Sequence, residues 1–104
     1  MDKREAVRVP VRVRASCHAH DELLVGTVED ISRSGAFFLA PHRAQLGDTA
    51  EIQLDLQGEQ IRIAAEVVRI VDEPRAGIGL RFVGQSERTR RPLANFIMQC
   101  HATR

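Results

Sequence analysis

Apolar residues recur at every second position in four stretches of the chain, and this period constrains the fold more than any other feature. Side chains of a β-strand point alternately to opposite faces, so alternation of apolar and polar residues indicates a strand with one buried face. The alternating stretches are residues 9–14, 51–56, 61–70 and 78–83. Two further apolar runs, residues 23–30 and 36–40, bring the predicted number of strands to six.

The predicted strand at 61–70 changes phase along its length. Ile61 and Ile63 begin an alternation that continues to Val67, whereas Val68 and Ile70 fall out of step with it. An extra residue in one strand, a β-bulge, produces this shift and bends the strand, as small barrels require at their corners. The phase change therefore indicates a bulge or a sharp bend near Val68.

Turn residues separate the predicted strands. Pro10 has no N–H to donate, which places it at a strand start or on an edge. Residues 16–22 are predicted to form a polar link, and Gln57-Gly58-Glu59 a tight hairpin. Asp30-Ile31-Ser32-Arg33-Ser34-Gly35 lies between two apolar runs and has the short polar residues and the positive-φ tolerance of glycine that turns use.

The C-terminal segment follows a helical period instead. Four apolar residues at i, i+3, i+4 and i+7 form one stripe: Leu93, Phe96, Ile97 and Cys100. Ser86 is a suitable N-cap for a helix over residues 86–101, and Pro92 is the alternative first position. The predicted fold is dominated by β-structure: six antiparallel strands that close into a barrel, with one C-terminal α-helix over an opening.

Bulk composition limits the classes of function. A chain of 104 residues with 43% hydrophobic residues forms one domain with a real core. No apolar run is long enough for membrane insertion, and the charged N-terminus has no apolar stretch of a secretory signal behind it. We therefore expect a cytoplasmic protein in which Cys17 and Cys100 are reduced thiols.

Other chemistries have weaker support. A small barrel that binds DNA or RNA through Arg12, Arg14, Arg62 and Arg81 is an alternative, but the net charge is only +1 and aromatic residues are 4% of the chain. His18 and His20 have the spacing of metal ligands, but they are more typical of exposed histidines in a link, so no metal is expected. No pairing of a nucleophile with a base is evident in the sequence, and an enzyme is not expected.

Two motifs carry binding chemistry. Arg4 and Arg8 precede the first predicted strand, and in an extended segment residues four apart point the same way. Two guanidinium groups so placed suit a polyanionic, flat ligand, because arginine forks onto phosphate oxygens and stacks on bases. Asp30 and Ser32 place a carboxylate and a hydroxyl at the rim of the sheet. Each feature alone is more typical of a charged tail or a hairpin turn than of a binding site.

Taken together and in order, these motifs resemble the PilZ domain family. The residues that carry the resemblance are R-x-x-x-R at 4–8, D-x-S-x-x-G at 30–35 and the strand Gly77-Ile78-Gly79-Leu80-Arg81-Phe82, followed by the terminal helix. The resemblance covers nearly the whole chain from about Lys3. It implies a PilZ-type barrel over residues 9–104 with a mobile arm at residues 1–8.

The resemblance also implies a function. The expected role is that of a bacterial receptor for cyclic di-GMP, without another cofactor, that controls motility, pili, polysaccharide synthesis or virulence through an unidentified downstream protein. The ligand would order the arm over the barrel. The residues carried over as contacts are Arg4, Arg8, Asp30, Ser32 and Gly35, with Lys3 and Arg33 as candidate additional contacts. In this family an Arg at the position of Lys3 accompanies an intercalated ligand dimer, so the resemblance leaves one or two ligands open. An adaptor that acts without ligand is the alternative.

Overall fold

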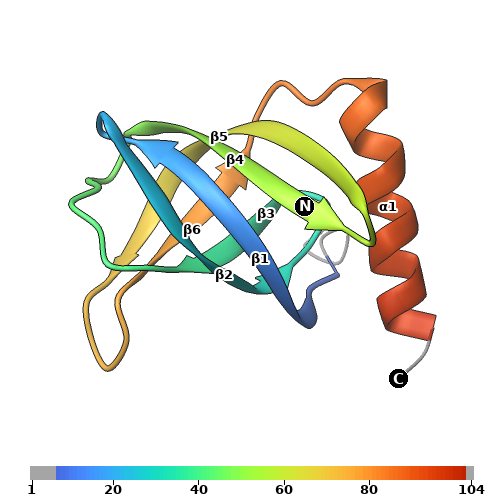
Figure 1. The fold of residues 1–104 in the computed structure, drawn as a ribbon, viewed down its shortest axis with the longest axis horizontal. Helices are drawn as coiled ribbons and strands as arrows, with labels where there is room; N and C mark the ends of the chain where they lie inside the picture. The colour runs from blue at the N-terminus through green and yellow to red at the C-terminus, as the bar shows by residue number, and fades with distance from the viewer. Residues whose placement is uncertain (1–6, 103–104) are drawn as a thin grey trace.

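The computed structural model describes residues 7–102, in which six antiparallel strands form a closed barrel with one C-terminal helix (Figure 1). This confirms the predicted architecture. Around the barrel the strands run in the order β1-β2-β3-β6-β5-β4. Their bounds are β1 Val9–Ala19, β2 Glu22–Ile31, β3 Gly35–Leu39, β4 Thr49–Leu56, β5 Glu59–Val71 and β6 Gly77–Phe82, and the helix α1 spans Glu87–Ala102.

The first strand is longer than the sequence period indicates, so the predicted polar link at residues 16–22 is wrong. β1 continues to Ala19, and its inward positions there are the buried residues Ala15, Cys17 and Ala19. These small side chains extend the alternation without giving a strongly apolar signal. The reversal to β2 takes only His20 and Asp21, both with positive φ, at 54° and 59°.

β5 contains a bulge at the position where the sequence changes phase. The pairing of β5 with β6 shifts register between Val67 and Arg69, which turns Val68 outward to 48% exposure. β1 has a similar shift between Pro10 and Val13 against β2. Pro10 is the second residue of β1, where pairing with β4 has not begun, since that ladder starts at Ala15. Pro10 therefore lies at the strand start, on a part of β1 that pairs with β2 alone.

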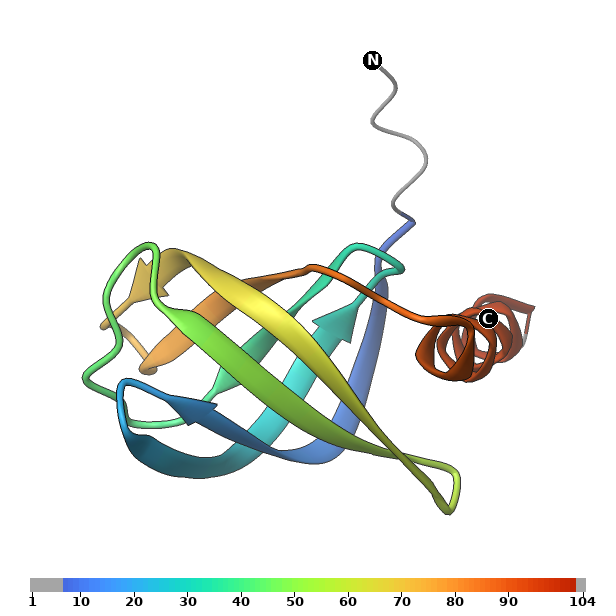
Figure 2. The same cartoon turned by 90° about the horizontal axis from the view of Figure 1, so that it is seen from above.

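The helix packs against the barrel beside β1, β4 and β5 (Figure 2). Its buried residues Leu93, Phe96 and Ile97 join the hydrophobic core that the inward faces of the strands form. Among the described residues, no helix combines the length and the apolar character needed to cross a lipid bilayer.

The helix begins one turn before Pro92, so the alternative start at that proline is wrong. The Ser86 carbonyl accepts hydrogen bonds from the amides of Thr89 and Arg90, at 3.1 and 2.8 Å, which places Ser86 at the N-cap. The Thr89 hydroxyl accepts from the Ser86 amide in return. Pro92 lies inside the helix and costs it one main-chain hydrogen bond.

Cys17 is the most enclosed titratable group of the described chain. It lies on β1 between Leu24 of β2 and Ile52 of β4, and it has no exposed surface. Burial raises the pKa of its thiol from 9.0 to about 11, because the thiolate loses hydration there.

We predict that the protein loses stability between pH 9 and pH 11 through this thiol. The folded-state pKa is raised, so the contribution is complete below pH 9 and disappears as the pH rises to about 11. Two pKa units correspond to about 3 kcal/mol of unfolding free energy. The chain has no tyrosine and a single lysine, so few other groups titrate in this window.

Urea denaturation at pH 8, 9, 10 and 11 checks this prediction. The loss should persist in Cys100→Ser and be much smaller in Cys17→Ala. If Cys17→Ala kept the full pH dependence, the buried thiol would not be its source.

Candidate functional site

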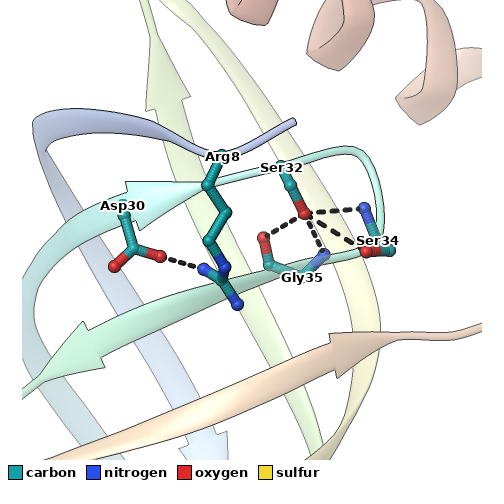
Figure 3. Close-up of polar contacts among 5 residues, drawn as sticks. All are labelled: Arg8, Asp30, Ser32, Ser34 and Gly35. Carbon is teal, nitrogen blue, oxygen red and sulfur yellow. Dashed lines mark hydrogen bonds and ion pairs between the residues drawn. The ribbon is translucent and has the colours of Figure 1, made fainter. Parts of the chain in front are cut away.

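The pairing register of β1 with β2 brings the two sequence motifs together. Val9 lies opposite Ile31, both buried, and Pro10 lies opposite Asp30. The residue before β1 therefore emerges beside the end of β2. There Arg8 forms an ion pair with the Asp30 carboxylate through its Nη1 (Figure 3). The side chains are 57% and 35% exposed, so both remain open to a ligand.

Ser32 has a different environment from Asp30. It is 1% exposed, and its hydroxyl oxygen accepts hydrogen bonds from the amides of Ser34 and Gly35, each at 3.1 Å (Figure 3). The Ser32 amide in turn donates to the Gly35 carbonyl at 2.8 Å. The hydroxyl thus holds the β2–β3 turn closed from inside and points away from the open surface.

Gly35 is required for close packing rather than for a left-handed backbone. The described glycines with positive φ are Gly47, Gly58 and Gly84, so the positive φ expected in the turn is not found at Gly35. Instead, a Cβ atom at Gly35 would overlap the carbonyl oxygen of Leu80 on β6. The motif glycine lets β3 approach β6.

The turn is also tied to the segment that leads into the helix. The Ser34 carbonyl accepts from the Phe82 amide at 2.8 Å, and the Arg33 carbonyl accepts from Gln85 Nε2 at 2.9 Å. Arg90 of α1 donates to the carbonyl of Gln85 at 3.4 Å. A force on the turn therefore reaches the start of α1 through hydrogen bonds that no sequence motif indicates.

An aromatic and a guanidinium lie next to Asp30 on the outer face of the barrel. Asp30 pairs with Phe37 on β3, and Phe37 pairs with Gly79 on β6. The Arg69 guanidinium lies 5.7 Å from the centroid of the Phe37 ring, over the space that the absent side chain of Gly79 leaves. This is a flat surface beside the carboxylate. It joins outward positions of strands distant in sequence, so the sequence alone does not reveal it.

Other predicted residues stand apart from this cluster or outside the described chain. Lys3 and Arg4 lie outside the described residues. Arg33 is exposed in the turn, at the rim of the site. His20 contacts Asp48 at 3.5 Å, and among residues 7–101 no three His, Cys, Asp or Glu side chains gather as metal ligands.

The groups of the site are suited to binding. The Ser32 hydroxyl contacts backbone groups of the turn and the hydroxyl of Ser34, which lies at 3.2 Å. What the site offers is a carboxylate acceptor, a guanidinium donor and a flat cationic and aromatic surface. These groups complement a ligand with hydrogen-bonding bases and negative charge.

We predict that Ser32→Ala destabilises the protein by about 1–3 kcal/mol, because it leaves the buried amide of Gly35 and the partly buried amide of Ser34 without their acceptor. Ser34→Ala is the matched control: its residue is exposed, and we expect a loss of at most about 0.5 kcal/mol. Urea denaturation at neutral pH measures both values. Equal losses in the two variants would show that the Ser32 hydroxyl does not hold the turn.

Comparison with known structures shows the same fold. The inhibitor of motility MotI/DgrA of Bacillus subtilis superposes with a TM-score of 0.86 at 17% identity, covering 100% of this chain, which spans only 53% of that chain. The PilZ domain of YcgR from Escherichia coli, solved with c-di-GMP, gives a TM-score of 0.77 at 18% identity and coverage of 98% and 94%. The PilZ domain of CeSA from a cellulose-synthesizing bacterium gives 0.72 at 18% identity, with 93% and 97% covered.

Sequence comparison gives the family directly. A search of curated proteins found no match. The family model of the PilZ domain, however, matches residues 2–99, a span that includes both motifs and most of the helix. The chain belongs to the PilZ domain family.

Proposed function

We propose that this chain is a receptor for cyclic di-GMP that binds the ligand at Arg8 and Asp30 and passes the signal to another protein. The observation that carries the proposal is the convergence of the two motifs at one exposed place through the β1–β2 register. Family membership and the YcgR domain solved with c-di-GMP support the identity of the ligand.

The chemistry of the pair fits both parts of a guanine dinucleotide. A carboxylate such as that of Asp30 accepts from the N1–H and N2–H groups of guanine, and a guanidinium such as that of Arg8 forks onto phosphate or the guanine O6/N7 edge. In the structure the two residues pair with each other. An exposed ion pair contributes at most about 1 kcal/mol, so the ligand can replace it at little cost.

Ser32 and Gly35 support the site from beneath. The Ser32 hydroxyl is buried and bonded within the turn, and Gly35 lies against β6. We therefore assign both a positioning role: they hold the turn that follows Asp30. A direct contact of Ser32 with the ligand, which the family resemblance implies, would require its hydroxyl to leave these bonds.

The flat surface of Phe37 and Arg69 extends the proposed site. It lies directly beside Asp30 in the β2–β3 register. A base whose edge bonds Asp30 would lie over this surface, and guanidinium groups stack on bases. We propose Arg69 as a further contact of one guanine.

The proposed switch is the ordering of residues 1–8 over the barrel. Arg4 and Lys3, outside the described residues, would complete the contacts with the ligand, and Arg33 lies at the rim. Arm closure would then act on the turn, which contacts the segment before α1 through Gln85. The protein would act as a binding module in the cytoplasm and not as an enzyme.

Isothermal titration with cyclic di-GMP tests the proposal. We expect a Kd of about 1 μM or lower, which corresponds to a binding free energy of about −8 kcal/mol or one that is more negative. Arg8→Ala should weaken binding about 10- to 100-fold, because a charge-assisted hydrogen bond to the ligand is lost. The matched control is Arg43→Ala, an exposed arginine that pairs with Glu22 at the opposite end of β2, and it should bind as the unmodified chain does.

Two results would contradict the proposal. Absence of binding heat at high protein concentration would favour the adaptor, which acts through protein contacts alone. Equal weakening by Arg8→Ala and Arg43→Ala would show that binding does not use the motif arginine.

A further inference from the structure

The exposed arginines of the described chain differ in their partners. Arg90 donates to the Gln85 carbonyl, and Arg69 lies over the Phe37 ring. Arg8, Arg43, Arg75 and Arg81 each form an ion pair with a carboxylate. Five others are exposed and form no ion pair or hydrogen bond with any residue of the described part of the chain: Arg12, Arg14, Arg62, Arg88 and Arg91.

Each of these five arginines lines one of two grooves beside α1. Arg62, Arg88 and Arg91 line a groove of about 580 Å³ between β5 and the start of α1. Arg12 and Arg14 line a second groove, of about 370 Å³, between β1 and the later part of α1. Residues of the β4–β5 hairpin line both grooves: Glu59 and Gln60 the first, Asp55 and Gln57 the second.

The two grooves carry an excess of positive charge. Their linings contain five arginines and three carboxylates, those of Asp55, Glu59 and Glu87. The formal charge of the whole chain is only +1. Guanidinium groups that lie near one another without carboxylate partners repel each other. Their collection beside α1 therefore points to an anionic partner.

An exposed apolar side chain lies on α1 outside the two grooves. Arg88, Arg91 and Met98 fall on one stripe of α1, at steps of three and seven residues, and Met98 is 68% exposed. Methionine is flexible and polarizable, and it adapts to varied apolar partners at binding surfaces.

We propose that this helix–hairpin face, formed by Arg12, Arg14, Arg62, Arg88 and Arg91 with Met98, binds an acidic segment of a partner protein that carries at least one apolar anchor. Arginine matches the planar carboxylates of Asp and Glu with two parallel hydrogen bonds. A chain segment fits such grooves, whereas a flat bilayer surface does not enter them.

Nucleic acid fits this face less well than protein does. Binding to single strands uses exposed aromatic rings as stacking platforms, and the aromatic residue in these grooves, Phe96, is 8% exposed. The proposal goes beyond cyclic di-GMP binding, since none of the five arginines belongs to the ligand site. It supplies the surface through which such a receptor would engage its target.

Fluorescence anisotropy with a defined probe tests the proposal on the full chain. The probe is a fluorescein-labelled 12-residue peptide of glutamate and leucine, and the comparison peptide has lysine in place of glutamate. We expect the acidic peptide alone to bind. Arg62→Glu and Arg91→Glu should each weaken it about tenfold or more, because reversal turns attraction into repulsion. Arg43→Glu, on the other side of the barrel, should change binding less than twofold.

Three outcomes would overturn the proposal: no binding of the acidic peptide, equal binding of both peptides, or equal effects of Arg91→Glu and Arg43→Glu. Arginine-dependent binding of phosphatidylglycerol vesicles or of an oligo-dT strand in place of the peptide would also overturn it. Thermal unfolding of each variant verifies its fold.

The two proposals fail independently. Cyclic di-GMP titrated into Arg91→Glu should bind as it does to the unmodified chain. If Arg91→Glu no longer bound the peptide but still bound cyclic di-GMP, the helix–hairpin face would serve the partner alone. Loss of both in this variant would contradict a docking face separate from the ligand site.

Discussion

The pairing of Val9 with Ile31 is the constraint on which the proposed site depends. Both side chains are buried, and a slip of one residue would turn the inward faces of β1 and β2 toward solvent. The core therefore fixes this register. Because the register is fixed, Arg8 emerges beside Asp30, and the two ion-pair there. Hydrophobic burial inside the barrel thus determines which charged groups meet on its outside.

The β2–β3 turn connects this constraint to the rest of the molecule. Ser32 closes the turn from within, Gly35 brings β3 against β6, and Gln85 links the Arg33 carbonyl to the segment before α1. The same few residues therefore maintain the barrel and support the proposed ligand site. The helix–hairpin face, which we propose as a docking site, includes residues of α1 at the other end of this connection.

The sequence predicts the barrel well because strands with one buried face must alternate, and it places the bulge near Val68 because a bulge breaks that alternation. It misses the end of β1, since Ala15, Cys17 and Ala19 are buried without being strongly apolar. The motif residues are identifiable from the chain alone, but their division of roles is not. The sequence predicts Ser32 to be a ligand contact at the rim of the sheet, whereas in the structure its side chain is buried. The Phe37–Arg69 surface and the arginine face arise only from strand order, which brings distant segments together.

The central claim is that Arg8, Asp30 and the adjoining turn form one ligand site. Amide chemical-shift mapping by NMR during titration with cyclic di-GMP tests it most directly. We expect the largest shifts at Arg8, at Asp30 and in residues 33–37, with smaller shifts at Gln85. Shifts confined to the helix–hairpin face, or none at saturating ligand, would contradict it.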